Sequence, residues 1–228
     1  MPNVTLILRL AQLLQKRCFL LFLAILALMV ALPFLSGTPQ GRVIGNLCNL
    51  IVLVTAVAAV GRSVPSFVIA LLLALPQLPF QLLALKSGEP GYFALTWGFG
   101  AAFYAFALVH LLHYVLRKDR LTSDKLYGAV AAYMMIAILW AFLYGVLQYF
   151  YPGAYSLGGT PKTLDMGELI YFSFSVLTTS GFGDITPMLI QSRFLAVLEQ
   201  VTGVMYVAIL IARLTGVYPI VGTNPDEH

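Results

Sequence analysis

The stretch from Thr178 to Asp184, with the sequence TTSGFGD, carries the residues best suited to binding a cation through the backbone. Gly181 and Gly183 open conformations that are closed to residues with a Cβ, so that successive carbonyl groups can turn toward one axis. A row of such carbonyls can replace the water shell of a bare monovalent cation. One strand of carbonyls cannot surround an ion, so several chains must share the axis. The stretch therefore predicts an ion filter shared between copies of the chain.

The composition indicates where such a filter would lie. Hydrophobic residues make up 60% of the 228 residues, charged residues make up 10%, and the mean hydropathy is +0.90. These values exceed those of soluble domains and predict an integral membrane protein. The net charge of +4 comes from short basic clusters between apolar stretches, and no phosphate-binding glycine loop is present. Basic clusters of this kind determine topology, so a nucleic-acid partner is excluded.

Six apolar stretches have about the length of roughly 20 residues that a spanning helix needs. We predict an all-α membrane protein with six transmembrane helices, and with a re-entrant pore helix and a selectivity filter between the fifth and the sixth. The predicted spans cover residues 18–35, 43–60, 65–85, 92–116, 125–149 and 188–214. Pro76 and Pro79 should kink the third span, because each proline removes a backbone donor.

The chain divides into parts by composition. The parts are an amphipathic cytoplasmic segment (1–17), a four-helix transmembrane domain without voltage-sensing charges (18–116), a cytoplasmic linker (117–124), a pore domain (125–214) and a short cytoplasmic tail (215–228). The tail is too short to fold alone, so no cytoplasmic ligand-binding domain is expected in this chain. The fourth span carries no arginine ladder, and voltage sensing by a charged fourth helix is therefore not expected.

A short helix precedes the filter. Asp165 and Glu168 have the spacing of a capping box, which predicts a helix over residues 166–178. This helix is too short to cross a membrane and must re-enter, with its negative C-terminal dipole pointing toward the place where a cation pauses. Residues 152–161 lack apolar periodicity and are predicted to form an exposed turret loop.

Basic residues indicate the orientation. With both termini cytoplasmic, the inner side holds Arg9, Lys16, Arg17, Arg62, Arg117, Lys118, Arg120, Lys125 and Arg213. The outer side holds Arg42, Lys86, Lys162 and Arg193. This bias predicts a plasma (cell inner) membrane protein whose filter faces outward.

The filter stretch resembles the TTVGYGD signature of potassium channels, with Ser180 in place of valine and Phe182 in place of tyrosine. The resemblance extends over residues 121–216, where EQVTGVMYVAILIARLTG from Glu199 is similar to inner helices of small bacterial potassium channels. It implies a potassium-selective, homotetrameric channel in membrane lipid, with K⁺ as permeant ion and no other cofactor. The implied ion-coordinating residues are Thr179, Ser180, Gly181, Phe182 and Gly183.

The resemblance also implies supporting roles. Asp184 would anchor the filter to the pore helix or attract cations. Ser175, Thr178 and Ser173 would either hold the filter from behind by hydrogen bonds or back-bond to their own helix. Ser180 and Phe182 leave a weakly selective or nonselective monovalent cation channel as an alternative, because Phe182 lacks the hydroxyl with which tyrosine ties the filter to the pore helix.

Two residues of the last span have two interpretations each. Gly203 is either a gating hinge or a site of close helix packing. Glu199 is either a functional, proton-sensitive support near the pore helix or a carboxyl group that holds two helices together by a hydrogen bond. The sequence leaves both choices open.

Other classes of protein were weighed. Gly181 to Asp184 also fits the GxGD pattern of intramembrane aspartyl proteases, which need a second intramembrane aspartate. The other aspartates, Asp119, Asp124, Asp165 and Asp226, fall in predicted loops or the tail. His110 and His113 lack a carboxylate partner, so no transition-metal site is expected, and no inverted repeat indicates a transporter. No catalytic residue is predicted, and we expect no enzyme.

Overall fold

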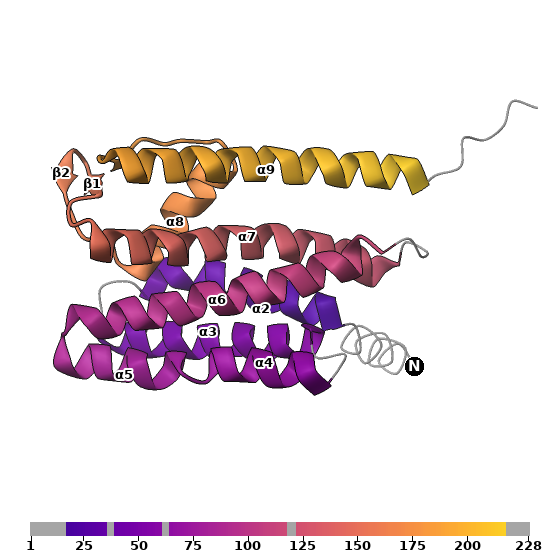
Figure 1. The fold of residues 1–228 in the computed structure, drawn as a ribbon, viewed down its shortest axis with the longest axis horizontal. Helices are drawn as coiled ribbons and strands as arrows, with labels where there is room; N and C mark the ends of the chain where they lie inside the picture. Colours follow the sequence, from indigo (N-terminus) through magenta and orange to yellow (C-terminus); the bar gives the residue numbers. More distant parts are fainter. Residues whose placement is uncertain (1–16, 36–38, 61–63, 118–121, 218–228) are drawn as a thin grey trace, which may run out of the picture.

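The computed structural model describes residues 17–35, 39–60, 64–117 and 122–217 and is mostly helical (Figure 1). The helices are α2 (Arg17–Leu35), α3 (Pro39–Val60), α4 (Val64–Ala74), α5 (Gln77–Ser87), α6 (Pro90–Val115), α7 (Ser123–Phe150), α8 (Met166–Leu177) and α9 (Ile190–Val217). Most of the predicted N-terminal segment and cytoplasmic tail lies outside the described residues.

Five stretches among the described residues are long and apolar enough to cross a membrane. They are Arg17–Phe34, Val64–Ser87, Pro90–Val115, Ser123–Phe150 and Ile190–Arg213, whereas α3 contributes a shorter apolar stretch, Cys48–Ala59. An all-α membrane protein is therefore confirmed in outline, and a sixth span through α3 stays a prediction.

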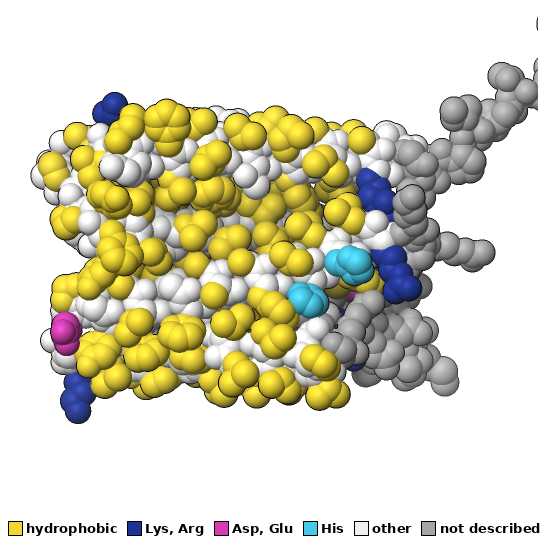
Figure 2. Space-filling view, viewed as in Figure 1, with side chains coloured by type: hydrophobic (Ala, Val, Ile, Leu, Met, Phe, Trp, Pro, Cys, Tyr) yellow, Lys and Arg dark blue, Asp and Glu magenta, His cyan; other side chains and the backbone are white. Residues whose placement is uncertain are grey.

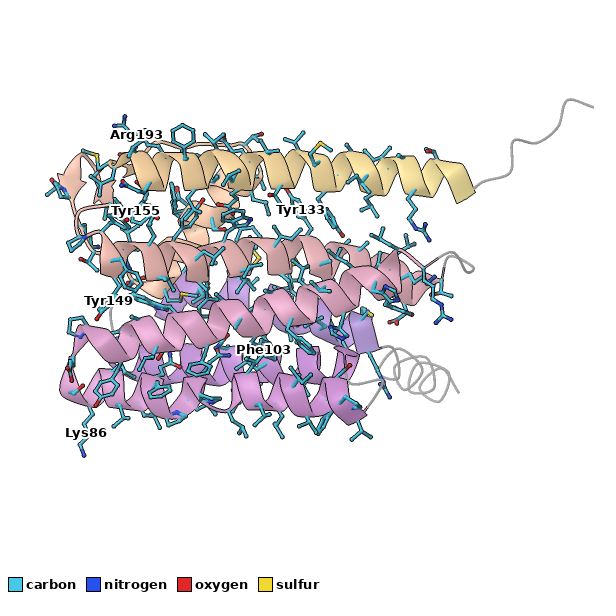
Figure 3. All side chains as sticks on the ribbon, viewed as in Figure 1. Lys86, Phe103, Tyr133, Tyr149, Tyr155 and Arg193 are labelled. Atoms are coloured by element: carbon cyan, nitrogen blue, oxygen red, sulfur yellow. The ribbon has the colours of Figure 1, made fainter. Side chains whose placement is uncertain are left out.

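Hydrogen bonds show that the long helices alternate in direction. Arg17 at the start of α2 donates to the Ala58 carbonyl near the end of α3 (3.3 Å). At the same end of the bundle, Arg213 of α9 donates to the carbonyl of Arg117, just beyond α6. Figure 3 places Lys86 and Arg193 at the opposite end.

In Figure 2, the blue Lys and Arg side chains lie near the two ends of the visible face and yellow apolar side chains cover its middle. This distribution is the one that a bilayer requires.

The predicted third span is interrupted by proline. α4 ends at Ala74 and α5 begins at Gln77, with Pro76 in the N-cap position of α5. Proline cannot donate a backbone hydrogen bond, so the helical ladder is broken there. The two short helices together still form one apolar stretch of 24 residues.

The core is densest where α6 packs on α7. A Cβ at Gly100 would lie 2.3 Å from the Phe142 ring, and one at Gly145 would lie 2.7 Å from the Trp97 ring. Small residues therefore let the aromatic side chains of each helix approach the backbone of the other. The helix α7 also packs against α8 and α9, so it connects the α6 contact to both of these helices.

The turret contains a small sheet, which the sequence analysis missed. The strands β1 (Tyr155–Leu157), β2 (Thr160–Pro161) and β3 (Ile185–Pro187) pair antiparallel in the order β2-β1-β3. β3 directly follows the filter stretch, so the turret and the outer end of the filter form one unit. Ala154, Tyr155 and Ser156 are buried, so the predicted exposed loop is only partly exposed.

Candidate ion-conduction site

The helix α8 lies between α7 and α9, and the filter stretch follows directly after it (Figure 1). The predicted capping box is present at its start: the Glu168 amide donates to Asp165 Oδ1 (2.9 Å), and the Asp165 amide donates to Glu168 Oε2 (3.0 Å). Lys162 also donates to Glu168 Oε1 (2.5 Å), and this hydrogen bond raises the pKa of the Lys162 ammonium. These hydrogen bonds fix the first turn of α8, which lies before the apolar part of the helix.

A buried amide side chain clamps the segment that enters α8. Gln148 of α7 donates through Nε2 to the Leu164 carbonyl (2.9 Å), and its Oε1 accepts from the Leu164 amide (3.0 Å). The side chain therefore pairs with a backbone residue on both of its edges. A glutamine next to the turret carries no sequence signal for this role, so the sequence analysis missed it.

The backbone of the filter alternates in handedness. Thr179, Gly181 and Gly183 have φ angles of 58°, 54° and 82°, and Thr179 is the one non-glycine residue with positive φ in the described part of the chain. A positive φ is costly for threonine and recurs at functional sites. When left-handed and right-handed residues alternate, successive carbonyls point to the same side, whereas in a strand they point to opposite sides. This is the geometry that a filter needs.

The amide groups of the filter point back toward α8. The amides of Ser180 and Gly181 donate to the Ser175 carbonyl (3.0 and 3.2 Å), and the Phe182 amide donates to Ser175 Oγ (3.3 Å). Within the described residues, nothing donates a hydrogen bond to the carbonyl oxygens of residues 179–182. The backbone amides of residues 180–182 are thus bonded to α8, whereas the carbonyl oxygens of residues 179–182 are left to bind a ligand.

Hydroxyl groups and a ring support the filter where it departs from the potassium-channel signature. Ser180 Oγ lies 2.8 Å from Thr178 Oγ1, so the smaller polar side chain has a polar partner. The Phe182 ring stacks on Tyr171 of α8, with 6.1 Å between centroids and 12° between planes. The Tyr171 side chain also lies within electrostatic range of the Asp184 carboxyl group.

The end of the filter stretch that precedes β3 is held by the turret sheet. The Asp184 carbonyl accepts from the Gly158 amide (2.8 Å), and Ser156 Oγ lies 2.7 Å from Thr186 Oγ1 between β1 and β3. The Asp184 side chain accepts from the Ile185 amide (2.9 Å). Asp184 is therefore tied to the turret through its carbonyl group, and its side chain also lies near Tyr171 of α8.

The end of α8, where the filter stretch begins, lies against α9 at Gly203. A Cβ on Gly203 would lie 2.4 Å from the Leu177 carbonyl oxygen, at the end of α8. The same carbonyl accepts a hydrogen bond from the Tyr133 hydroxyl of α7 (3.3 Å), in the space between α7 and α9 where Figure 3 shows Tyr133. The absence of a side chain at Gly203 thus allows close packing, and its role as a hinge stays a prediction.

Glu199 is fully buried one turn before Gly203. Its Oε1 lies 2.5 Å from Ser173 Oγ of α8, and its Oε2 accepts from the Tyr144 hydroxyl of α7. Glu199 therefore connects three helices, α7, α8 and α9, whereas the sequence suggested a bond between two helices.

The residues that an aspartyl protease or a metal site would need do not lie together among the described residues. Asp124 accepts from the Cys18 amide (3.2 Å) and the Tyr114 hydroxyl (3.2 Å) at the start of α7, and Asp165 caps α8, so neither forms a pair with Asp184. Among the described residues, no group of three or more His, Cys, Asp or Glu side chains could hold a metal ion. His110 instead contacts Ser66 Oγ through Nε2 (3.3 Å).

Comparison with known proteins shows similarity to ion channels, and the family match falls on α7 to α9. Residues 132–218 match a family model described as ion channel. The voltage-gated potassium channel Kch of Escherichia coli (strain K12) is 29% identical over 119 residues, which cover 52% of this chain and 27% of that protein. The chain thus spans about a quarter of the length of this relative. No solved structure matches the chain. The two matches confirm the predicted resemblance to the potassium-channel family.

Proposed function

We propose that this chain forms a potassium-selective channel in which four copies of the Thr178–Asp184 stretch surround one axis. The observation that carries the proposal is the filter backbone: its handedness alternates at residues 179, 181 and 183, its amides are bonded to α8, and its carbonyls have no internal donor. Carbonyl rings of this kind replace the hydration shell of K⁺. The coordinating groups are the carbonyls of residues 179–182 and the Thr179 hydroxyl, with Gly183 completing the turn.

The exposed surface of the single chain supports assembly. Phe182 has 71% of its surface exposed. Among the residues of α9 whose side chains are described, the buried ones form a narrow stripe of Ser192, Ala196, Glu199 and Gly203. The remaining apolar faces of α9 are free to contact other copies and lipid. One loop per chain supplies a quarter of a closed ring, which favours a homotetramer.

Gating by a charged fourth helix is not part of the proposal. The sequence of α6 holds no lysine or arginine, and moving one charge through the field contributes about 2.3 kcal/mol per 100 mV. The relative named as voltage-gated is matched over only 27% of its length, so its gating is not carried over. The proposed orientation has both termini cytoplasmic and the filter facing outward, in keeping with the charge bias.

A weakly selective cation channel is the second candidate, and the absence of a hydroxyl on Phe182 favours it. A reversal-potential measurement on purified protein in a planar bilayer separates the two, with K⁺ on one side and Na⁺ on the other. A selective channel reverses close to the K⁺ equilibrium potential, whereas a nonselective channel reverses near zero. A preparation that is tetrameric and passes no cation at all would refute both candidates.

A further inference from the structure

The hydrogen bonds around Glu199 determine how many protons this buried cluster holds. Ser173 Oγ lies 2.6 Å from the Ala137 carbonyl oxygen and 2.5 Å from Glu199 Oε1. A serine hydroxyl carries one proton, and a carbonyl can only accept. The Ser173 proton must therefore lie toward Ala137, because two oxygens 2.6 Å apart without a proton between them would oppose lone pairs.

The second short contact then needs a proton from Glu199. With its own proton directed at Ala137, Ser173 Oγ can only accept from Glu199 Oε1. The Tyr144 hydroxyl donates to the other carboxyl oxygen. One order of donation satisfies all of these contacts: Tyr144 donates to Glu199, Glu199 donates to Ser173, and Ser173 donates to the Ala137 carbonyl. This order requires Glu199 to be a protonated carboxylic acid.

The surroundings agree with a neutral group. The titratable side chains that face Glu199 are Tyr133 and Tyr144 of α7 and Tyr155 of β1, while α8 contributes only Ser173. No cationic group is among the partners of Glu199 in the described part of the chain. An ionised carboxylate without a counter-charge is costly inside a membrane.

We propose that Glu199 is a neutral carboxylic acid whose proton completes this relay and thereby positions the pore helix α8. Ser173 lies two residues before Ser175, which receives the amides of the filter. A shift at Ser173 is therefore passed to the filter within half a helical turn. This positioning role rests on the proposed channel function, whereas the protonation state does not.

Infrared spectroscopy tests the proton directly. The difference spectrum between the wild type and Glu199→Gln at neutral pH should contain the carbonyl stretching band of a protonated carboxylic acid, shifted in D2O. Ionised carboxylate bands in that difference spectrum would overturn the proposal. Should the variant fail to fold, wild-type protein with isotope-labelled glutamate can be measured instead, and the label then falls on the four glutamates of the chain. A protonated-acid band that shifts with the label supports the proposal, and the absence of such a band would overturn it.

Conduction tests the positioning. The glutamine amide can donate to Ser173 and accept from Tyr144, so Glu199→Gln should keep the wild-type reversal potential. Raising the pH until the wild-type acid band disappears should move its reversal potential toward zero and leave that of Glu199→Gln unchanged. An unchanged wild-type reversal potential after loss of the band would refute the positioning role. Protein that shows the band but conducts no K⁺ would refute only the channel function.

A matched pair of tyrosine variants isolates the relay. Tyr144→Phe removes the first donor, whereas Tyr155→Phe removes a buried hydroxyl that has no hydrogen-bond partner in the described structure. The two rings lie 5.8 Å apart and lose the same atom. Tyr144→Phe should lose K⁺ over Na⁺ selectivity while Tyr155→Phe keeps it, and equal effects of the two variants would contradict the relay.

Discussion

The backbone of Gly183 offers a sharp test of the filter, because the turret contains a glycine in the same conformation. Gly183 and Gly159 both have a φ of 82°. An added Cβ would find nothing within 4 Å at Gly159, and its nearest neighbour at Gly183 is the Gly181 carbonyl oxygen, 4.0 Å away. Alanine at either position therefore meets the same backbone strain and no steric clash.

The size of the effect follows from that strain. A side chain in the left-handed region costs about 1–2 kcal/mol per residue. That cost changes a conformational ratio by a factor of roughly 5–30. In a tetrameric filter all loops must hold the conducting conformation at once, so the penalty at Gly183 acts four times on one conduction path. At Gly159 it lowers the stability of each turret and leaves the path intact.

The assay is K⁺ flux into liposomes, normalised to the amount of assembled protein. We expect Gly183→Ala to assemble and to lose nearly all flux, and Gly159→Ala to conduct as the wild type does while unfolding at a lower temperature. Wild-type flux and reversal potential in Gly183→Ala would refute the assignment of residues 179–183 as the filter. Loss of flux in assembled Gly159→Ala would show that backbone strain anywhere in the turret stops conduction, which would remove the basis of the comparison.

Three further predictions concern the mounting of the pore helix and are measured by thermal unfolding in detergent. Gly203→Ala should destabilise the protein by about 1–3 kcal/mol through overpacking, since its Cβ would lie 2.4 Å from the Leu177 carbonyl oxygen. The control Gly98→Ala, whose Cβ would have no atom within 4 Å, should be neutral or stabilising. Equal effects of the two variants would contradict the close packing of α8 on α9. Gln148→Leu should cost roughly 1–3 kcal/mol because it leaves both backbone groups of Leu164 without their partner, and Gln191→Leu on the exposed side of α9 is its control. Asp165→Ala should cost about 0.5–2 kcal/mol by removing the cap of α8, and a loss no larger than that of the exposed Lys86→Ala would speak against the capping box.

The sequence predicted those features that depend on local pattern. The capping box at Asp165 and Glu168, the break at Pro76 and the apolar helices all follow from neighbouring residues, and the structure contains them. The predicted ion-coordinating residues lie together because they are consecutive in the chain.

Features that depend on residues far apart in the chain were missed. The strands β1 and β3 are only three residues long, and their pairing joins segments about 30 residues apart, as the contact between Ser156 and Thr186 shows. The clamp of Gln148 on Leu164 likewise arises from tertiary packing. A glutamine has no spacing or neighbour that identifies such a role, so no local rule could have found it.

The turret sheet has a consequence for the order in which a channel would be built. All three of its strands come from one chain, and so do the hydrogen bonds from the filter amides to Ser175. The loop is thus held at both ends before any other copy arrives. Because the loop is already ordered, association of the chains does not pay the entropy of ordering it. If four chains assemble as proposed, each chain can fold its own quarter of the pore, and oligomerisation needs only to bring the folded chains together.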